Sequence, residues 1–340
     1  MAIRPAYFLV TSLNWFGSVL PMSVMVLLAQ ARGLTLAQVG LYVGIYSLTV
    51  ALCELPSGAI ADTFGRKRTV MVSYALASVA KLVFLFAFDM STFIAYAVVW
   101  GMARALGSGA LEAWFIDGIQ AHDPDADVQQ ALARAGTFSL IGLAAGTLAG
   151  SALPGLFNWL PADGTAVVSP LSTTVVASVV VGVMVITLTG LVVRDPRPPR
   201  TPVRSATGRP RRSTVRSVLQ AAVSDVAATM RDSLALVRHN PRLRALLGAE
   251  LAVGLALTAT ETFWQPFFAD LMTSVTQEPA HGSTAGAGGV LVAASGPDGT
   301  LLFGVVLAGC FGAGVIGNLI ATPLAARARR RYAGLAGVFL

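Results

Sequence analysis

Charged residues are scarce in this 340-residue sequence: Asp, Glu, Lys and Arg together make up 12%, and hydrophobic residues make up 55%. A soluble domain carries about 25% charged and roughly 45–50% apolar residues. With a mean hydropathy of +0.69, the chain lacks the polar groups that a water-facing surface needs. The composition therefore excludes an ordinary soluble globule and indicates lipid as the solvent.

Reactive side chains are also few, because the chain has only two cysteines and three histidines. Cys53 and Cys310 both lie inside apolar runs, which is typical of inert buried thiols. His122, His239 and His281 are scattered, so we expect no metal site. The chain also lacks a phosphate-binding glycine loop and any enzyme constellation. We therefore expect no enzyme, no cofactor and no ATP-driven pump.

Long apolar runs, by contrast, are abundant. Eight are close to the 20 or so residues that a helix needs to cross a bilayer. The first is too long for the core of a signal peptide, so we interpret it as an uncleaved helix. A ninth run begins near Tyr332 and reaches Leu340 before it can span. The eight predicted spans are 6–29, 38–58, 69–89, 91–112, 133–157, 166–193, 244–270 and 301–326.

The net charge of +7 is concentrated in alternate loops. Basic residues occur at 66–68, at Arg134, through 194–244 and at 327–331, whereas the opposite loops hold almost none, with Arg32 as the exception. This alternation is typical of cytoplasmic loops rather than of a nucleic-acid-binding surface. We therefore predict a multi-pass protein of the cell membrane with a cytoplasmic N-terminus and no nucleic-acid partner.

The long basic segment between the sixth and seventh runs divides the chain into three predicted regions. They are an N-terminal part with six helices at 1–193, a basic cytoplasmic linker at 194–243, and a partial C-terminal part at 244–340. The linker begins rich in Pro and Arg, and helical periodicity returns at about 214–237. That second part is either an amphipathic helix on the inner membrane face or a solvated connector. The Gly- and Ser-rich stretch at 273–299 is predicted to be an outer loop.

The most specific motif follows the second run: Gly58 and Asp62 at four-residue spacing, then Gly65, Arg66, Lys67 and Arg68. Gly58 would permit close helix contact and Gly65 a tight turn. An ordinary basic loop explains the three cations but not the spacing of the glycines and the acid. The motif resembles the signature of the major facilitator superfamily.

The resemblance implies an all-α membrane fold of two six-helix halves. The stretch from Glu54 to Gly58 is similar to a bacterial drug- or metabolite-efflux branch of the family. In the family an acid at the end of the fourth helix can join the loop charges, which makes Asp62, Arg66 and Asp117 a candidate conformational latch. The latch set also includes Gly58, Gly65, Lys67 and Arg68.

The family also often carries an arginine in the fourth helix, where Arg104 stands. Arg104, Ser108 and Glu112 follow at four-residue spacing, so we expect them on one helix face. Charge inside a spanning helix is costly. Arg104 therefore either faces a central cavity or is a structural pair or a snorkelling side chain.

Two further charges are predicted to lie deep in the bilayer. Lys81 should be roughly 12 Å from the outer end of its helix, which is far for snorkelling. Glu261 precedes Trp264 and Pro266, and the proline could break the helix and free carbonyls toward a cavity. Together with Arg104 and Glu112, these residues form the predicted substrate and proton cavity, unless Glu261 only pairs with Lys81 or Arg104.

The fifth run holds Gly142, Gly146 and Gly150 at four-residue spacing. Such a stripe favours helix packing. In antiporters of the family the same helix carries a glycine-rich motif with a Gly-Pro pair, but here Gly146 is followed by Thr147. The glycines therefore hint at export and favour simple packing more strongly.

The resemblance implies a secondary transporter working by alternating access, with a small-molecule substrate, protons and the lipid bilayer as partners. Our first expectation is proton-coupled efflux of an apolar or cationic molecule, and the alternatives are an uptake symporter or a non-transporting sensor. Eight helices and part of a ninth leave the second half of a twelve-helix plan incomplete. We therefore expect a C-terminally truncated fragment or gene product that is poorly stable and inactive alone.

Overall fold

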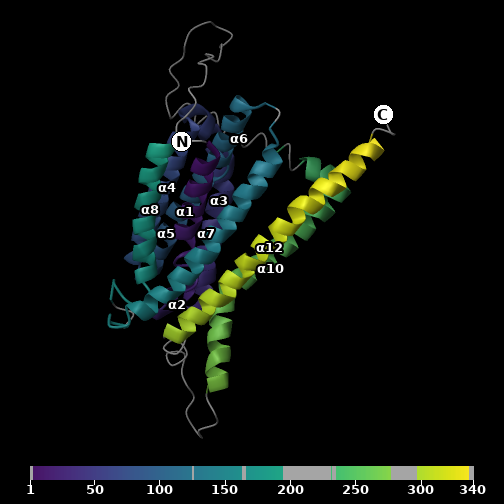
Figure 1. The fold of residues 1–340 in the computed structure, drawn as a ribbon. Helices are drawn as coiled ribbons and strands as arrows, with labels where there is room; N and C mark the ends of the chain where they lie inside the picture. The colour runs from purple at the N-terminus through teal and green to yellow at the C-terminus, as the bar shows by residue number, and fades with distance from the viewer. Residues whose placement is uncertain are drawn as a thin grey trace. The chain divides into compact units, whose positions relative to one another are not determined.

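The computed structural model of the protein describes residues 3–124, 126–162, 166–193, 231, 235–276 and 297–336 (Figure 1). Within these ranges every regular element is a helix. Most of the predicted linker at 194–243, including its amphipathic part, and most of the outer loop at 273–299 lie outside the described residues. The helices are α1 (Ile3–Val19), α2 (Met25–Ala31), α3 (Leu36–Phe64), α4 (Arg66–Leu85), α5 (Met90–Gly107), α6 (Ala110–His122), α7 (Val128–Leu156), α8 (Thr173–Val192), α10 (Pro241–Thr276) and α12 (Pro297–Ala336).

The structure confirms the all-helical membrane fold and changes three of the predicted boundaries. The first run is split into α1 and α2 by turns around Pro21, which cannot donate a helical hydrogen bond. The fourth run is split after α5, where Gly109 has a φ of +72°. The separate ninth helix predicted from Tyr332 is wrong, because α12 continues through that residue to Ala336.

Six helical segments among the described residues are long and apolar enough to cross a membrane. They comprise most of α3, then α4, α5 with α6, α7, α8 and most of α12. The divided first run and α10 are not among them, so the count of eight stays a prediction. Large apolar side chains such as Leu52, Val180 and Leu191 are 61%, 64% and 73% exposed. Such faces suit contact with lipid and would be costly in water.

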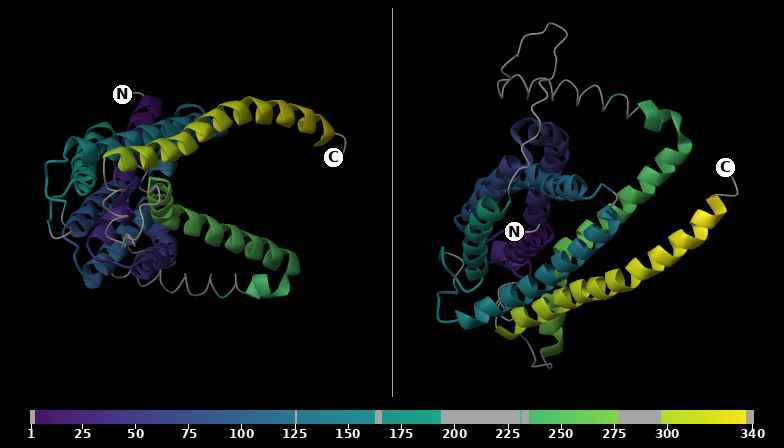
Figure 2. Two further views of the ribbon diagram at one scale, coloured as in Figure 1. Left: turned by 90° about the horizontal axis from the view of Figure 1, so that it is seen from below. Right: turned by 45° about the horizontal axis from the view of Figure 1, so that its top comes forward.

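The described helices fall into two compact units. The first holds α1, α7, α8 and α12, and α12 lies along α7 (Figures 1 and 2). The Asn318 amide on α12 donates hydrogen bonds of 2.9 Å to the carbonyl oxygen of Ala133 and to the Thr137 hydroxyl on α7. The Ser12 hydroxyl on α1 donates to the Phe138 carbonyl of α7 over 2.9 Å. Polar ties therefore join the helices inside the apolar bundle.

The three glycines of α7 form the contact with α1. A Cβ atom at Gly142 or Gly146 would clash with the carbonyl oxygen of Ser12 or Phe16 in α1, and one at Gly150 would clash with that of Leu20, just after α1. Only glycine allows this approach, which brings the two backbones into direct contact. The packing interpretation of the stripe is therefore confirmed, and the stripe itself needs no role in export.

The second unit holds α3, α4, α5 and α10. Gly101 of α5 faces α3, where an added Cβ would lie 2.7 Å from the Cβ of Thr49. The Ser73 hydroxyl of α4 donates to the Ala103 carbonyl of α5 over 2.8 Å. On the other side of α3, a Cβ at Gly40 would be in ordinary contact, at 3.6 Å, with the Phe263 ring of α10. In this unit α5 therefore packs closely on both α3 and α4.

We predict that Gly146→Ala lowers the stability of the protein, because the added methyl group must push α1 away from α7. Overpacking of this kind costs about 1–3 kcal/mol. The measurement is the thermal unfolding midpoint of the purified protein in detergent. Gly309→Ala on α12 is the matched control, since no described atom lies within 4 Å of its Cβ position. Equal midpoints for the two variants would contradict the packing role.

Candidate functional site

The loop motif is built around a one-residue turn. Gly65 ends α3 and begins α4 with a φ of +92° and a ψ of 141°, a conformation that side chains disfavour. Its N–H donates to the Ala61 carbonyl over 3.0 Å, and its own carbonyl accepts from the Thr69 hydroxyl over 3.1 Å. The turn predicted at Gly65 is therefore confirmed.

The turn places three cations in the first turn of α4, where the helix dipole is positive. Arg66 and Lys67 are half-buried and Arg68 is exposed. Cations at a helix amino end are unfavourable unless an anion lies nearby. Asp62 is one turn upstream on α3, but its side chain is not among those described.

The other members of the predicted latch give no test of it. Asp117 is an exposed residue of α6, and its contact with Asp62 and Arg66 stays a prediction. The close contact expected at Gly58 is not seen, because no described atom lies within 4 Å of a Cβ built there. Of the two glycines in the motif, the structure therefore supports a backbone role for Gly65 alone.

Arg104 belongs to a polar cluster between α3 and α5. Its guanidinium and the Trp100 indole of α5 both lie close to the Tyr46 hydroxyl of α3. Tyr46 and Trp100 are half-buried, and Arg104 is exposed. The sequence identified Arg104 and missed its two partners, which carry no charge and sit among many other aromatic residues.

Lys81 of α4 also contacts this cluster. Its Nζ atom lies 5.5 Å from the centroid of the Trp100 ring, and the residue is only 6% exposed. Since α4 ends at Leu85, Lys81 is about 6 Å from the helix end rather than the predicted 12 Å. The depth was overestimated, but the side chain is buried against Trp100 instead of reaching the surface.

Toward the start of α5 from Trp100, buried aromatic rings lie between α3, α4 and α5. Tyr96 lies next to Trp100 with ring centroids 6.4 Å apart and an interplanar angle of 23°. Tyr96 also contacts Tyr42 at 6.2 Å and Phe84 at 4.8 Å. These buried rings pack against one side of the cluster.

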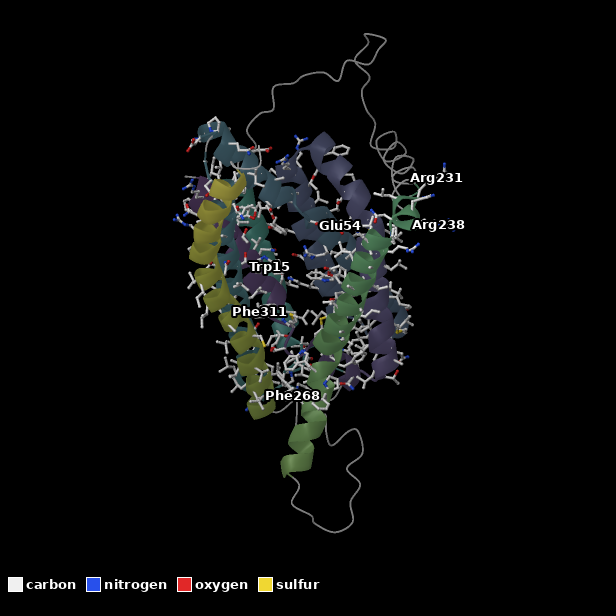
Figure 3. The ribbon with its side chains drawn as sticks, turned by 90° about the vertical axis from the view of Figure 1, so that its right-hand side faces the viewer. Trp15, Glu54, Arg231, Arg238, Phe268 and Phe311 are labelled. Carbon is white, nitrogen blue, oxygen red and sulfur yellow. The ribbon has the colours of Figure 1, made fainter. Side chains whose placement is uncertain are left out.

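The predicted single face of Arg104, Ser108 and Glu112 is wrong. The helix breaks at Ser108 and Gly109, so Glu112 starts a new helix, α6, as an exposed residue of its first turn. Ser108 instead donates a 2.8 Å hydrogen bond to the carboxylate of Glu54 on α3, which Figure 3 labels. Glu54 is thus an interhelical partner of Ser108, a contact that the sequence does not predict.

The predicted acid of α10 cannot be placed, since the Glu261 side chain is outside those described. Trp264 is half-buried, with its ring 6.1 Å from that of Phe268, which is labelled in Figure 3. The break expected at Pro266 does not occur, because α10 runs unbroken to Thr276. A proline removes one hydrogen bond and kinks a helix without necessarily ending it.

Arg32, the exception among the outer loops, caps the carboxyl end of α4. Its guanidinium donates to the carbonyl oxygens of Phe84 (2.7 Å), Leu85 (2.9 Å) and Ala87 (3.0 Å), and it lies 4.6 Å above the Phe88 ring centroid. Burial lowers the pKa of Arg32 to about 10, so the group stays protonated at neutral pH. The residue is therefore a structural cap at the negative end of a helix dipole.

Apolar helices, interhelical glycines and charges held within the bundle define the class: a multi-pass helical membrane protein. The chain belongs to the Major Facilitator Superfamily, whose sequence profile matches residues 7–340. The family comprises membrane transporters.

A crystal structure of the nucleoside transporter NupG, determined as a point mutant, resembles the chain with a TM-score of 0.55 and 14% sequence identity. The match covers 85% of this chain and 64% of that chain. At this identity the likeness shows the fold alone. No curated protein sequence matches the chain.

We predict that Arg32→Gln destabilises the carboxyl end of α4. A hydrogen bond to a charged group contributes about 1.5–3 kcal/mol, and glutamine can replace only part of this set. The measurement is the thermal unfolding midpoint, together with hydrogen exchange at the carboxyl end of α4. Arg134→Gln, at an exposed position of α7, is the control. If both variants lost the same stability, Arg32 would not be a cap.

Proposed function

We propose that the protein is a secondary active transporter that exports a small molecule in exchange for protons by alternating access. It would lie in the cell membrane with its N-terminus in the cytoplasm. The observation that carries the proposal is the cluster of Tyr46, Trp100 and Arg104. Tyr46 and Trp100 are each ten residues into their helices, about 15 Å, which is half of a hydrocarbon core of about 30 Å.

Polar groups at this depth are costly unless they face a partner or water. An arginine exposed to lipid near the bilayer centre costs at least about 2.5–3.5 kcal/mol. Arg104 is exposed on its own unit, so a lipid-facing position would be unfavourable. Substrate sites of secondary transporters lie near the midplane, and the cluster has the depth and chemistry for one.

Alternating access also needs seams along which two halves can move. The sequence assigns α3 and α7 to the first half and α10 and α12 to the second. Within one unit α12 packs on α7, and within the other α10 contacts α3. Small residues such as Gly304, which faces Ser151, let such seams remain close while they slide.

The loop motif would act as a latch on this motion. Three cations at the amino end of α4 need an anion, and Asp62 is the nearest acid in sequence. We predict that Asp62→Asn impairs turnover more than substrate binding, because the latch biases a conformational equilibrium. Binding and turnover would be measured separately, with Asp62→Glu as the control that keeps the charge. Loss of binding with normal turnover of bound substrate would reject the latch.

The transport proposal is tested in everted membrane vesicles from the native cells, with and without the gene. Proton-driven uptake into everted vesicles that requires the gene would support efflux. Uptake into right-side-out vesicles would instead identify a symporter, and ligand binding without gradient-dependent flux would identify a sensor. A substrate screen on the same vesicles gives the transported compound.

Glu261 is the proposed proton-coupling residue, because it is an acid in the middle of α10. We predict that Glu261→Gln abolishes proton-driven flux while substrate exchange across the membrane continues, since exchange needs no net proton movement. Glu250→Gln, at an exposed position nearer the start of α10, is the matched control. Gradient-driven flux that survives in Glu261→Gln would exclude this role.

A further inference from the structure

Three polar side chains lie on one face of α1, namely those of Thr11, Asn14 and Ser18. Spacings of three and four residues place them one above another along the helix. Thr11 is only 8% exposed, and Asn14 and Ser18 are half-buried. Within the described part of the chain, none of these three side chains has a hydrogen-bond partner. The face therefore presents donors and acceptors that the packing of the protein does not use.

The other faces of α1 are taken up by neighbouring helices. Ser12 and Phe16 contact α7, and Gly17 contacts α8. The Gly17 carbonyl oxygen also accepts a hydrogen bond from the Ser178 hydroxyl of α8. Because the helix turns about 100° per residue, positions 11, 14 and 18 lie on a third face. That face is separate from the two by which α1 packs on α7 and α8.

The polar face lies at the middle of its helix bundle. Ser12 and Phe16 bracket Asn14 in the sequence, and Ser12 lies against Gly142, the central residue of the 29-residue helix α7. This helix is long and apolar enough to cross a membrane. Polar groups exposed to hydrocarbon at such a depth are costly. A lipid-facing position for three of them is therefore unfavourable.

Other hydroxyl groups of the same unit do find partners. The Thr147 hydroxyl donates to the Leu143 carbonyl oxygen over 2.8 Å, and the Ser12 hydroxyl donates to α7 over 2.9 Å. The carbonyl oxygen four residues back is within reach of a serine or threonine in any helix. Thr11 and Ser18 leave this local bond unmade, so their hydroxyl groups are available to a ligand.

The surroundings of the face within this unit carry no charge. Asp117 of α6 is on a helix that meets α1 at Ile3 and Tyr7, near the amino end of α1. A charged ligand group would find no opposite charge at the level of Asn14, whereas hydroxyl groups would find partners. No Asp, Glu, Lys, Arg or His occurs in α1 at 5–19, in α7 at 135–156, in α8 at 173–192 or in α12 at 299–320.

Aromatic rings accompany the polar groups. Tyr7, one turn before Thr11, stacks on Phe115 of α6 with ring centroids 4.0 Å apart and 8° between the ring planes. Trp15, which Figure 3 labels, follows Asn14 and is half-buried. A sugar ring has hydroxyl groups on its edge and C–H groups on its faces. It therefore matches a site in which hydroxyl and amide groups lie next to an aromatic ring.

We propose that this face of α1 binds an uncharged molecule rich in hydroxyl groups, of the carbohydrate class. Thr11, Asn14 and Ser18 would hydrogen-bond to its hydroxyl groups, and Trp15 would pack on an apolar face of its ring. The three polar residues extend over about 10 Å of helix, so one small ligand can reach them all. As the substrate class of a transporter, the inference rests on the proposed function; as a binding site, it stands alone.

The test uses the phenyl glycosides of glucose, galactose and ribose, each paired with the phenoxy ether of the same ring without hydroxyl groups. Binding to the full chain in phosphatidylcholine nanodiscs is measured by calorimetry, with empty nanodiscs as the blank. We expect at least one glycoside to bind about tenfold more tightly than its hydroxyl-free counterpart. Phenyl glucuronide, which carries a carboxylate, should bind more weakly than phenyl glucoside. Equal affinities within every pair, or a preference for the glucuronide, would overturn the proposal.

Variants then locate the site. Thr11→Val, Asn14→Leu and Ser18→Ala remove the polar groups with little change in shape. Each should reduce affinity for the preferred glycoside about three- to tenfold and leave that for the hydroxyl-free compound unchanged. Ser12→Ala is the matched control, because Ser12 neighbours Thr11 but bonds to α7. It should retain the affinity of the wild type. Unchanged glycoside affinity in all three variants would reject this location.

Thermal stability separates a ligand site from a structural role. Without ligand, the three variants should keep or raise the unfolding midpoint, because each replaces an unpartnered polar group by an apolar one. Ser12→Ala should lower the midpoint, since it loses an interhelical hydrogen bond. If all three variants lost as much stability as Ser12→Ala, the polar groups would be bonded within the protein and the proposal would be wrong.

Two further outcomes separate the inference from the proposed function. If a glycoside binds as expected but native vesicles show no gradient-driven flux of any compound, the transport function fails and the site stands. If the vesicles show gradient-driven flux and no glycoside binds, transport stands and the site on α1 is rejected.

Discussion

Hydrocarbon offers no hydrogen-bond partner, so every polar group of a spanning helix must find one inside the protein. Most hydroxyl groups here solve this locally: Thr49, Thr147 and Thr187 donate to the carbonyl oxygen four residues back, over 2.8 to 2.9 Å. Others donate across helices, as Ser178 of α8 does to the Gly17 carbonyl of α1. The hydrogen bonds between helices determine which helices are neighbours and how they are aligned along their axes. They hold helices together where lipid leaves no apolar attraction between them.

Close approach follows from the same constraint. Helices in lipid associate through van der Waals contact and short polar bonds, and both need backbones that nearly touch. The glycines of α7 supply that contact with α1, Gly101 supplies it between α5 and α3, and Gly304 supplies it between α12 and α7. At Gly101 and Gly304, the close contact occurs on helices that also carry polar side chains. The residues that permit packing and the residues that carry charge are therefore interleaved on α5, where Gly101 lies between Trp100 and Arg104.

Apolar runs predicted α3, α4, α7 and α8 to within a few residues at most ends, because run length and hydropathy decide where lipid-soluble helices lie. The turn at Gly65 was also predictable, because glycine readily adopts the positive φ of the single residue that separates α3 from α4.

The breaks within apolar runs were not predicted. Pro21 and Gly109 interrupt runs that composition joins, and Pro266 lies inside a helix that continues. Tertiary contacts decide whether a helix bends, breaks or continues at a proline or glycine, and a single sequence does not show those contacts. For the same reason, the sequence shows Arg104 as a charge within a helix but does not show that Tyr46 and Trp100 lie beside it.

Arg32 and Lys81 are similar cations that lie in different surroundings. Both are buried basic residues of the second unit, and each lies over an aromatic ring. Arg32 also donates to three backbone carbonyls at the end of α4, where the helix dipole is negative, so its charge is balanced by fixed structural groups. Lys81 lies within α4, where successive carbonyls are engaged in the helix, and its ammonium group extends toward a ring that is itself only half-buried. The two cations therefore differ in their surroundings, because fixed backbone dipoles hold Arg32, whereas Lys81 is buried between α4 and α5 against an aromatic ring.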